Sequence, residues 1–387
     1  MAAGSRARAP LLVLLVWPAR GLGLGVARPR PVASMQRPVR LPFWPLANGL
    51  ALTALDLVGL RDAAADAEAA IGGRVAPMSL GGEDADPFVL LVHHRHRFSA
   101  WDPLRPLLRL LIPEGFPAHP HRGFETVTMT IDGGLTHRDS LGVQQRYGDG
   151  EVQWLTAARG VLHEEMWWAN DDGRAELYQL WLNLPAAAKM VPPRIQLFVP
   201  PAVKAAAGDD GAEGGVRVHV LGGEYASVRA PVELAGAPVT LLRVEIPPGG
   251  EWVCPLPASR NCIVYVRTGA LEAGAEAAPT SLPAHHLAYL PARAAVGTDG
   301  VRLVNADRSP RGKPAEALVL AGEPLREPVA GGGTWVMNTQ AELDQADRDY
   351  AAGVMGVPWE HTATDDEWRA HVARARGAGA GGGAAPR

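Results

Sequence analysis

A chain of 387 residues is long enough for two domains of ordinary size or for one large unit of two barrels. A net charge of −4, with 20% charged residues, gives no general electrostatic reason to bind nucleic acid or an anionic membrane. We therefore expect neither direct nucleic-acid binding nor membrane association. The 44 glycines and 34 prolines predict frequent turns and short elements, which favours β structure.

The N-terminal segment differs in composition from the rest of the chain. Its seven arginines precede the first acidic residue, Asp56. An arginine-rich, acid-free segment is typical of organelle transit peptides, so we interpret residues 1–55 as a transit peptide or a disordered leader. The apolar run PLLVLLVW also fits a secretory signal core, and a wrongly assigned gene start is a further explanation. A transit peptide would place the protein in a chloroplast or mitochondrion; otherwise we expect the cytoplasm or nucleus.

Short runs with β character follow in a regular series. Examples are PFVLLVHH, ETVTMTI, EVQWL, AELYQLWLNL, VTLLRVEI, NCIVYV, HLAYL and VRLVNA, with glycine, proline and aspartate gathered between them. Regularly spaced short strands with turn signals predict a sandwich or barrel. Helical signals are weak until TQAELDQADRDYAAG, which predicts a C-terminal segment that braces the barrels.

The strand series contains an internal repeat. FPAHPHRGFETVTMTIDGGL is echoed by PLPASRNCIVYVRTGAL, and EVQWLTAARGV by HLAYLPARAAV, at one common offset of about 135 residues. One duplication explains both pairs and predicts two similar barrels in tandem. We place the barrels at residues 65–195 and 196–330, the helical segment at 331–370 and a disordered, low-complexity tail at 371–387.

Two histidines stand one residue apart at the start of a predicted strand, in FPAHPHRGFETVTMT. Residues i and i+2 of a strand share a face, so His119 and His121 should project together, with Glu125 on the same side if the strand is regular. The second copy has two prolines and an asparagine at these positions: Pro255, Pro257 and Asn261. If the first copy holds a metal there, the second cannot.

A second ligand pair occurs downstream in ARGVLHEEMWW, where His163 and Glu165 also stand at i and i+2. Two antiparallel strands could bring the pairs together as three imidazoles and one carboxylate, which suits Fe(II), Mn, Ni, Cu or Zn and leaves coordination positions open. A lone His-x-His motif is often incidental. The cluster in LVHHRHRF shows how easily histidines gather, and we interpret it as a polar strand end: His93, His94 and His96.

Several motifs, in order along the chain, resemble the pirin family. They are HPHRGFETVT, THRDS, EVQWLTAARGVLHEEM, LNLP followed by KMVPPRIQ, and GEPLREPV followed by WVMNTQAELDQADRDYAAG. The likeness covers most of residues 65–365. Pirins are similar to bicupins, so it implies an all-β fold of two face-to-face antiparallel barrels (double-stranded β-helices) with a few short helices, of which only the first binds iron. It places the metal ligands on His119, His121, His163 and Glu165.

The chain departs from the family pattern at two acidic residues. Glu164 replaces a small polar residue between the ligating histidine and glutamate, and Glu151 replaces an aspartate in the turn before VQW. Neither change removes a ligand. The extra carboxylate at position 164 would either tune the ion or face solvent.

The resemblance implies two main functions. The first is an Fe(II)-dependent dioxygenase of the quercetin 2,3-dioxygenase type, in which Glu165 would accept the flavonol proton. Aromatic residues near the motifs would either wall an apolar pocket or belong to ordinary barrel packing: Phe124, Trp154, Trp167 and Trp168. The second is an iron-dependent redox sensor or transcription cofactor that acts through protein contacts. A cupin with another substrate is a third reading. Other divalent metals could replace iron, the partners would be a small aromatic substrate or proteins, and we expect a monomer.

Overall fold

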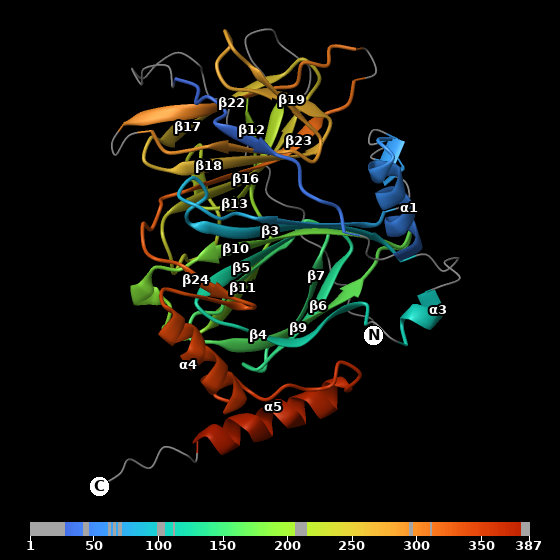
Figure 1. Cartoon of the computed structure of the whole chain (residues 1–387), viewed down its shortest axis with the longest axis vertical. Helices are drawn as coiled ribbons and strands as arrows, with labels where there is room; N and C mark the ends of the chain where they lie inside the picture. The colour runs from blue at the N-terminus through green and yellow to red at the C-terminus, as the bar shows by residue number, and fades with distance from the viewer. Residues whose placement is uncertain are drawn as a thin grey trace, which may run out of the picture.

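The computed structural model describes residues 28–41, 46–60, 63–64, 67–68, 72–98, 105–110, 113–205, 215–293, 297–309 and 312–380. Two β-barrels lie one above the other, and two C-terminal helices lie below the first barrel (Figure 1). Every pairing between neighbouring strands of the two barrels is antiparallel. The all-β, two-barrel prediction is therefore confirmed.

The first barrel consists of two sheets. The six-stranded sheet has the order β11-β8-β5-β10-β3-β2 and the four-stranded sheet the order β4-β9-β6-β7. The strands span Arg74–Ser79 (β2), Phe88–Arg97 (β3), Gly115–His121 (β4), Phe124–Asp132 (β5), Gly134–Asp139 (β6), Gln144–Gly148 (β7), Val152–Thr156 (β8), Val161–Trp168 (β9), Arg174–Asn183 (β10) and Arg194–Phe198 (β11).

The second barrel repeats this arrangement. Its sheets have the orders β1-β21-β18-β23-β16-β13-β12 and β17-β22-β19-β20. The strands span Ser34–Gln36 (β1), Ala202–Ala205 (β12), Val216–Gly222 (β13), Val239–Ile246 (β16), Glu251–Pro257 (β17), Asn261–Thr268 (β18), Ala270–Ala273 (β19), Thr280–Pro283 (β20), Leu287–Leu290 (β21), Thr298–Val304 (β22) and Ala315–Gly322 (β23). Two short hairpins complete the strands: Glu224–Tyr225 (β14) with Val228–Arg229 (β15), and Ala330–Gly332 (β24) with Trp335–Met337 (β25).

The strand orders of the two barrels correspond, except that β12 of the second barrel has no counterpart in the first. β4, β9, β6 and β7 take the places of β17, β22, β19 and β20, and β8, β5 and β10 those of β21, β18 and β23. The internal repeat in the sequence is thus a repeat of structure. One core cluster includes Trp154 and Tyr178 of the first barrel together with Leu241 and Tyr265 of the second, so the large sheets pack face to face.

The N-terminal segment differs from the predicted leader. β1 pairs with β21 at the edge of the second barrel, with Ser34 opposite Tyr289, so it occupies the position that β11 has in the first. Helix α1 spans Leu46–Leu57. Residues 28–36 therefore belong to the second barrel. An edge strand forms its backbone hydrogen bonds with the neighbouring strand, however far apart the two strands lie in the sequence. Residues 1–27 lie outside the described part.

The C-terminal segment begins as predicted and ends differently. Helix α4 spans Gln340–Ala351 and starts with a capping box formed by Thr339 and Glu342. Helix α5 spans Asp365–Ala380, so residues 371–380 of the predicted disordered tail are helical. The rest of that tail, residues 381–387, lies outside the described part. Two single turns occur at Arg105–Leu108 (α3) and Ala186–Ala188. No helix in the described ranges has the length and apolarity to cross a membrane.

The histidines of β3 are buried, in contrast to the predicted polar strand end. His93 faces the second barrel, and its Nδ1 lies 2.9 Å from Tyr265 Oη of that barrel. Its Nε2 lies 2.9 Å from Glu176 Oε1 of the neighbouring strand β10. His94 and His96 face the other way and pack against Trp167 of the first barrel. Sequence alternation correctly separates the two faces, but it does not show that a second barrel covers one of them.

Candidate metal centre

Strand β9 lies between β4 and β6 and carries the centre of the site. In register, His163 of β9 is opposite His119 of β4 on one side and Asp139 of β6 on the other. Two residues along β9, Glu165 is opposite His137 of β6. Directly opposed residues of antiparallel strands point to the same face, so these side chains converge inside the first barrel.

The structure brings the predicted histidines together. One potential ligand atom from each of His119, His121 and His163 lies within 4.8 Å of the others. The ring centroids of His119 and His163 are 4.4 Å apart, and His121 is 4.8 Å from each of them. A second group with the same spacing consists of His163, Glu165 and His137. The two groups share His163.

The histidines offer nitrogen atoms that no other protein group uses. Both ring nitrogens of His121 and of His163 are buried without a hydrogen-bond partner. His119 is anchored through Nδ1, which lies 2.8 Å from the Pro117 carbonyl oxygen, and this leaves its Nε2 for a ligand. Burial lowers the pKa of all three imidazoles, so they are neutral near pH 7 and keep a lone pair for a metal.

Glu165 is held by two neighbours inside the barrel. Gln179 of β10 donates from Nε2 to Glu165 Oε2 at 2.8 Å, and the Tyr147 hydroxyl lies 3.4 Å from Oε1. Burial, together with the charge of Glu165, raises the pKa of Tyr147 well above its usual range, so Tyr147 is a neutral donor. The carboxylate is thus fixed in orientation, as expected of a ligand supported by surrounding hydrogen bonds.

The residues fit a divalent cation. Unpartnered buried polar atoms are rare in folded proteins and call for a specific explanation, and four occur here on two adjacent imidazoles. Glu165 and Asp139 add two formal negative charges at 1% and 0% exposure. A cation between them would offset the cost of burying two carboxylates. An all-imidazole-and-carboxylate set without thiolates suits Fe(II), Mn, Ni, Cu or Zn.

Glu125 does not join the site. A turn at Gly123, with φ +89°, ends β4, so β5 is a separate strand and the parity of His119 and His121 does not continue into it. Glu125 faces the second barrel, accepts a hydrogen bond from the Thr156 hydroxyl at 2.6 Å, and has a pKa raised by burial. Val127 and Met129 lie in the core between the barrels.

Glu164 neither faces solvent nor reaches the centre. It points to the outer face of β9, where it is 1% exposed and accepts a short hydrogen bond from Arg138 Nε. Arg138 also donates to the Ala363 carbonyl oxygen at 2.8 Å, which links this pair to the segment before α5. Glu151 caps the turn after β7 by accepting from the Gly148 amide at 3.0 Å.

Aromatic side chains border the histidines on two sides. Phe124 and Trp181 lie 5.0 and 5.3 Å from the His121 ring, and Phe116 lies 6.4 Å from the His119 ring and 6.3 Å from Trp167. Of the predicted wall, Phe124 and Trp167 are therefore near the centre. Trp154 lies in the core between the barrels, and Trp168 donates to the Tyr147 carbonyl oxygen at 3.2 Å.

The second barrel fills the matching interior with apolar side chains. In the second barrel, Cys254 of β17 is paired with Val301 of β22, and these two correspond to His119 and His163. Leu303 of β22 corresponds to Glu165. Pro255 and Pro257, predicted opposite the histidines, point outward, because a one-residue shift in register reverses every side chain. The second barrel thus presents no corresponding ligand set in its described residues.

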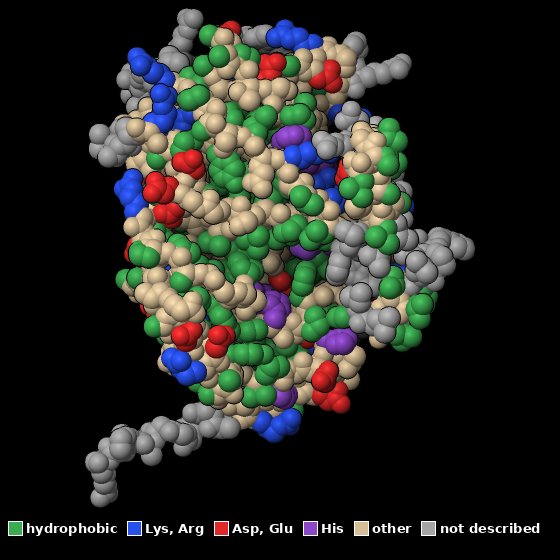
Figure 2. All heavy atoms as spheres, in the orientation of Figure 1, with side chains coloured by type: hydrophobic (Ala, Val, Ile, Leu, Met, Phe, Trp, Pro, Cys, Tyr) green, Lys and Arg blue, Asp and Glu red, His purple; other side chains and the backbone are tan. Residues whose placement is uncertain are grey.

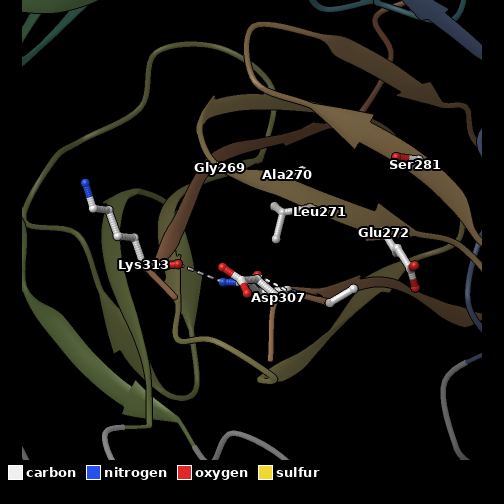
Figure 3. A pocket seen from close by; sticks show the side chains of 9 residues that line it. Gly269, Ala270, Leu271, Glu272, Ser281, Asp307 and Lys313 are labelled. Carbon is white, nitrogen blue, oxygen red and sulfur yellow. Dashed lines mark hydrogen bonds between the residues drawn. The ribbon is translucent and has the colours of Figure 1, made fainter. Parts of the chain in front are cut away.

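A hollow of about 470 Å³ lies away from the histidines, on the second barrel, between β19 and the loop that carries Asp307 and Lys313. In Figure 3 the Lys313 side chain points away from Asp307, and the Asn305 amide donates to the Lys313 carbonyl oxygen at 3.2 Å. On the first barrel, histidine side chains reach the face seen in Figure 2, set among apolar ones.

Sequence reasoning missed His137. It is 0% exposed, and its Nε2 lies 3.0 Å from Asp139 Oδ2. Its signal was present in THRDS, where histidine and aspartate stand at i and i+2 just as in the two recognised pairs. The motif contributed only to the family resemblance.

Comparisons with known proteins agree with this fold. The sequence profiles named Pirin and Pirin C-terminal cupin domain match residues 74–182 and 241–356. Pirin-like protein 2 of Arabidopsis thaliana is 36% identical over 63% of this chain and 72% of its own length, and human Pirin is 35% identical over 62% and 77%. The crystal structure of quercetin 2,3-dioxygenase from Acinetobacter baumannii superposes with a TM-score of 0.64 at 27% identity, covering 86% of this chain and 99% of that one. The chain belongs to the pirin family.

Proposed function

We propose that this protein is a metal-dependent dioxygenase that opens a flavonol ring, with Fe(II) as its metal. The observation that carries the proposal is the set of unpartnered imidazole nitrogens of His121 and His163 beside the anchored carboxylate of Glu165. The structural likeness to a quercetin 2,3-dioxygenase supports the choice of reaction.

Four residues would hold the ion: His119, His121, His163 and Glu165. When bound, an Fe(II) ion supplies Lewis acidity toward a flavonol oxygen and electrons toward O2. In the reaction, one O2 is incorporated and one ring carbon leaves as carbon monoxide, so no external reductant is needed. The protein must therefore bind the flavonol, take up its hydroxyl proton and exclude water.

Glu165 is the proton acceptor in this proposal. Its Oε2 accepts a hydrogen bond from Gln179 at 2.8 Å, which orients the carboxylate and leaves Oε1 with only the 3.4 Å contact to Tyr147. Oε1 is therefore the better placed atom to take the proton of the flavonol 3-hydroxyl. Proton transfer needs such an acceptor within hydrogen-bonding reach of the reacting group.

The aromatic side chains supply the binding surface for a flat substrate. Phe116 borders His119 on one side and packs against Trp167, and Phe124 and Trp181 border His121 on the other. Planar rings stack on aromatic faces and exclude water from the space between them. Phe116 and Trp181 are partly exposed, so both can meet a molecule that enters from solvent.

A second function, an iron-dependent redox sensor or transcription cofactor, is favoured by one observation. Glu164 stands between His163 and Glu165 on β9, and through Arg138 it contacts the segment that leads into α5. A shift of β9 on metal oxidation would therefore reach an outer surface formed by the C-terminal helices. In this alternative the surface binds a protein partner, and turnover is incidental.

The deciding experiment is aerobic consumption of quercetin by the full-length, Fe(II)-loaded protein, with carbon monoxide measured directly. His163→Ala should abolish both signals. His93→Gln is the matched control, because His93 is an equally buried histidine on the opposite face of the large sheet and should leave turnover intact. Wild-type protein that holds one iron per chain and yields no carbon monoxide would refute the flavonol reaction and favour the sensor.

A further inference from the structure

We infer that Lys189 is a positioning residue of the metal centre, because it ties the turn that follows His121 to strand β25. This role requires the metal site but not flavonol chemistry. Within the described residues, neither ring nitrogen of His121 has a hydrogen-bond partner. The ring therefore takes its place from its own backbone and from the rings packed around it, and whatever holds that backbone affects the geometry of the centre.

The backbone on the two sides of His121 is held by different elements. On the N-terminal side, β4 pairs with β9, and His121 is opposite Val161. On the C-terminal side, the chain leaves β4 and turns at Gly123, whose φ is +89°. The Gly123 amide donates to the Ala158 carbonyl oxygen at 2.8 Å, and its carbonyl oxygen accepts from Lys189 Nζ at 2.7 Å. Lys189 therefore holds the turn two residues after a predicted metal ligand.

Lys189 joins this turn to two other segments. Its Nζ also donates to the Val336 carbonyl oxygen of β25 at 2.8 Å and to Asn183 Oδ1, at the end of β10, at 2.5 Å. The residue is 1% exposed, and burial lowers the pKa of its amine to about 8, so the group keeps its proton at pH 7. The three N–H donors of the ammonium group are thus all used, each by a different segment.

The turn and β25 are in direct contact at this point. A Cβ at Gly123 would lie 2.0 Å from the Val336 carbonyl oxygen, and the Val336 amide donates to the Arg122 carbonyl oxygen at 3.0 Å. The ammonium group is bonded to carbonyl oxygens of both chains. Without it, both oxygens would lose a buried donor, and leaving a buried acceptor without its donor is costly. We therefore expect the turn to move when Lys189 is replaced, and His121 to move with it.

Strand β25 comes from a distant part of the chain. It follows the second barrel in the sequence, pairs with β24, and makes a parallel bridge between Trp335 and Arg122 of the first barrel (Figure 1). The next element along the chain is helix α4. The acceptors of Lys189 thus include both the turn after His121 and the segment that follows the second barrel. The placement of His121 therefore depends on this C-terminal segment, and Lys189 is the side chain that connects the two.

The test measures metal binding by the full-length protein and uses no flavonol. Lys189→Met keeps a long side chain but removes all three donors. It should weaken Co(II) affinity by about 10-fold in competition with a chelator. At saturating Co(II) it should also shift the visible ligand-field bands, because His121 would meet the ion at a changed angle. Lys189→Gln keeps an amide donor and should give a smaller change of the same kind.

The matched control is Arg30→Met, which removes another buried cation that donates to backbone carbonyl oxygens, those of Pro257 and Leu290 in the second barrel. It should lower stability and leave Co(II) affinity and bands unchanged. Equal changes in Arg30→Met and Lys189→Met would overturn the inference, because lost stability alone would then explain both.

Wild-type affinity and bands in a folded Lys189 variant would overturn the inference as well, and Lys189→Gln decides this point if Lys189→Met does not fold. A wild-type protein that binds no Co(II) would overturn the inference together with the metal site. A lack of carbon monoxide in the quercetin assay would instead refute the flavonol reaction alone.

Discussion

Replacing Arg30 by methionine should destabilise the second barrel by about 3–5 kcal/mol. The Arg30 side chain is 0% exposed inside that barrel, and its Nε donates to Asp299 Oδ1 at 2.5 Å. It also donates to the carbonyl oxygens of Pro257 at 2.7 Å and Leu290 at 3.2 Å. Without the guanidinium, the Asp299 carboxylate is left buried with no cation, which is the costly way to break a buried pair.

The pairwise part of this cost can be separated by a double-mutant cycle. Asp299→Asn alone should also be destabilising, because it leaves the buried Arg30 charge uncompensated. Arg30→Met combined with Asp299→Asn removes both charges and should be less destabilised than the sum of the two single changes by about 2 kcal/mol. Methionine keeps most of the apolar volume, so packing changes little.

The assay is equilibrium unfolding of the full-length protein in urea, followed by circular dichroism. Arg28→Met is the control: Arg28 lies two residues earlier and is exposed, so its replacement should change stability by less than about 0.5 kcal/mol. A loss below about 1 kcal/mol for Arg30→Met, or strict additivity in the cycle, would refute the reasoning.

Three other changes test separate parts of the structure. Burial lowers the pKa of His93 to about 4, so between pH 6.5 and 4 the unfolded chain binds a proton at this residue that the folded chain does not, and His93 alone should reduce stability by about 3 kcal/mol as pH drops. Urea unfolding of His93→Gln should show a loss over this range that is smaller by about this amount; an unchanged loss would contradict the prediction. Glu164→Gln should cost about 3 kcal/mol, because Arg138 loses its buried anion, yet retain metal; loss of metal would contradict the outward placement of Glu164. Gly123→Ala should lower the melting temperature, because a Cβ there would lie 2.0 Å from the Val336 carbonyl oxygen at φ +89°; an unchanged temperature would argue against this close approach.

The strands and the duplication could be predicted because they depend on local pattern. Short apolar runs between turn residues located most strands, and one offset aligned the two copies. The meeting of the two pairs, His119 with His121 and His163 with Glu165, was also predictable, since it needs only the two-residue period of a strand. Their role as metal ligands stays a prediction that the His163→Ala experiment addresses.

Contacts between residues that lie far apart in the sequence could not be predicted from it. Nothing in the arginine-rich composition of the N-terminal segment shows that β1 adds to β21, or that Arg30 enters the second barrel. The burial of His93 likewise depends on Tyr265, which is remote in sequence. His137 was accessible in principle, but a histidine and an aspartate at i and i+2 become a candidate site only when β6 is known to lie beside β9.

The two barrels fill equivalent interior positions with different kinds of side chain, and this explains why their sequences differ at those positions. The first collects imidazoles and carboxylates, several of whose buried atoms have no hydrogen-bond partner within the described residues. The second has Cys254 and Val301 at corresponding positions, and its buried carboxylate Asp299 receives a cation from within the chain, Arg30. If any N-terminal processing occurs, a cut before residue 28 preserves this pair, whereas a cut at residue 55 removes both β1 and Arg30. A leader that ended at residue 55 would therefore include the part that completes the second barrel.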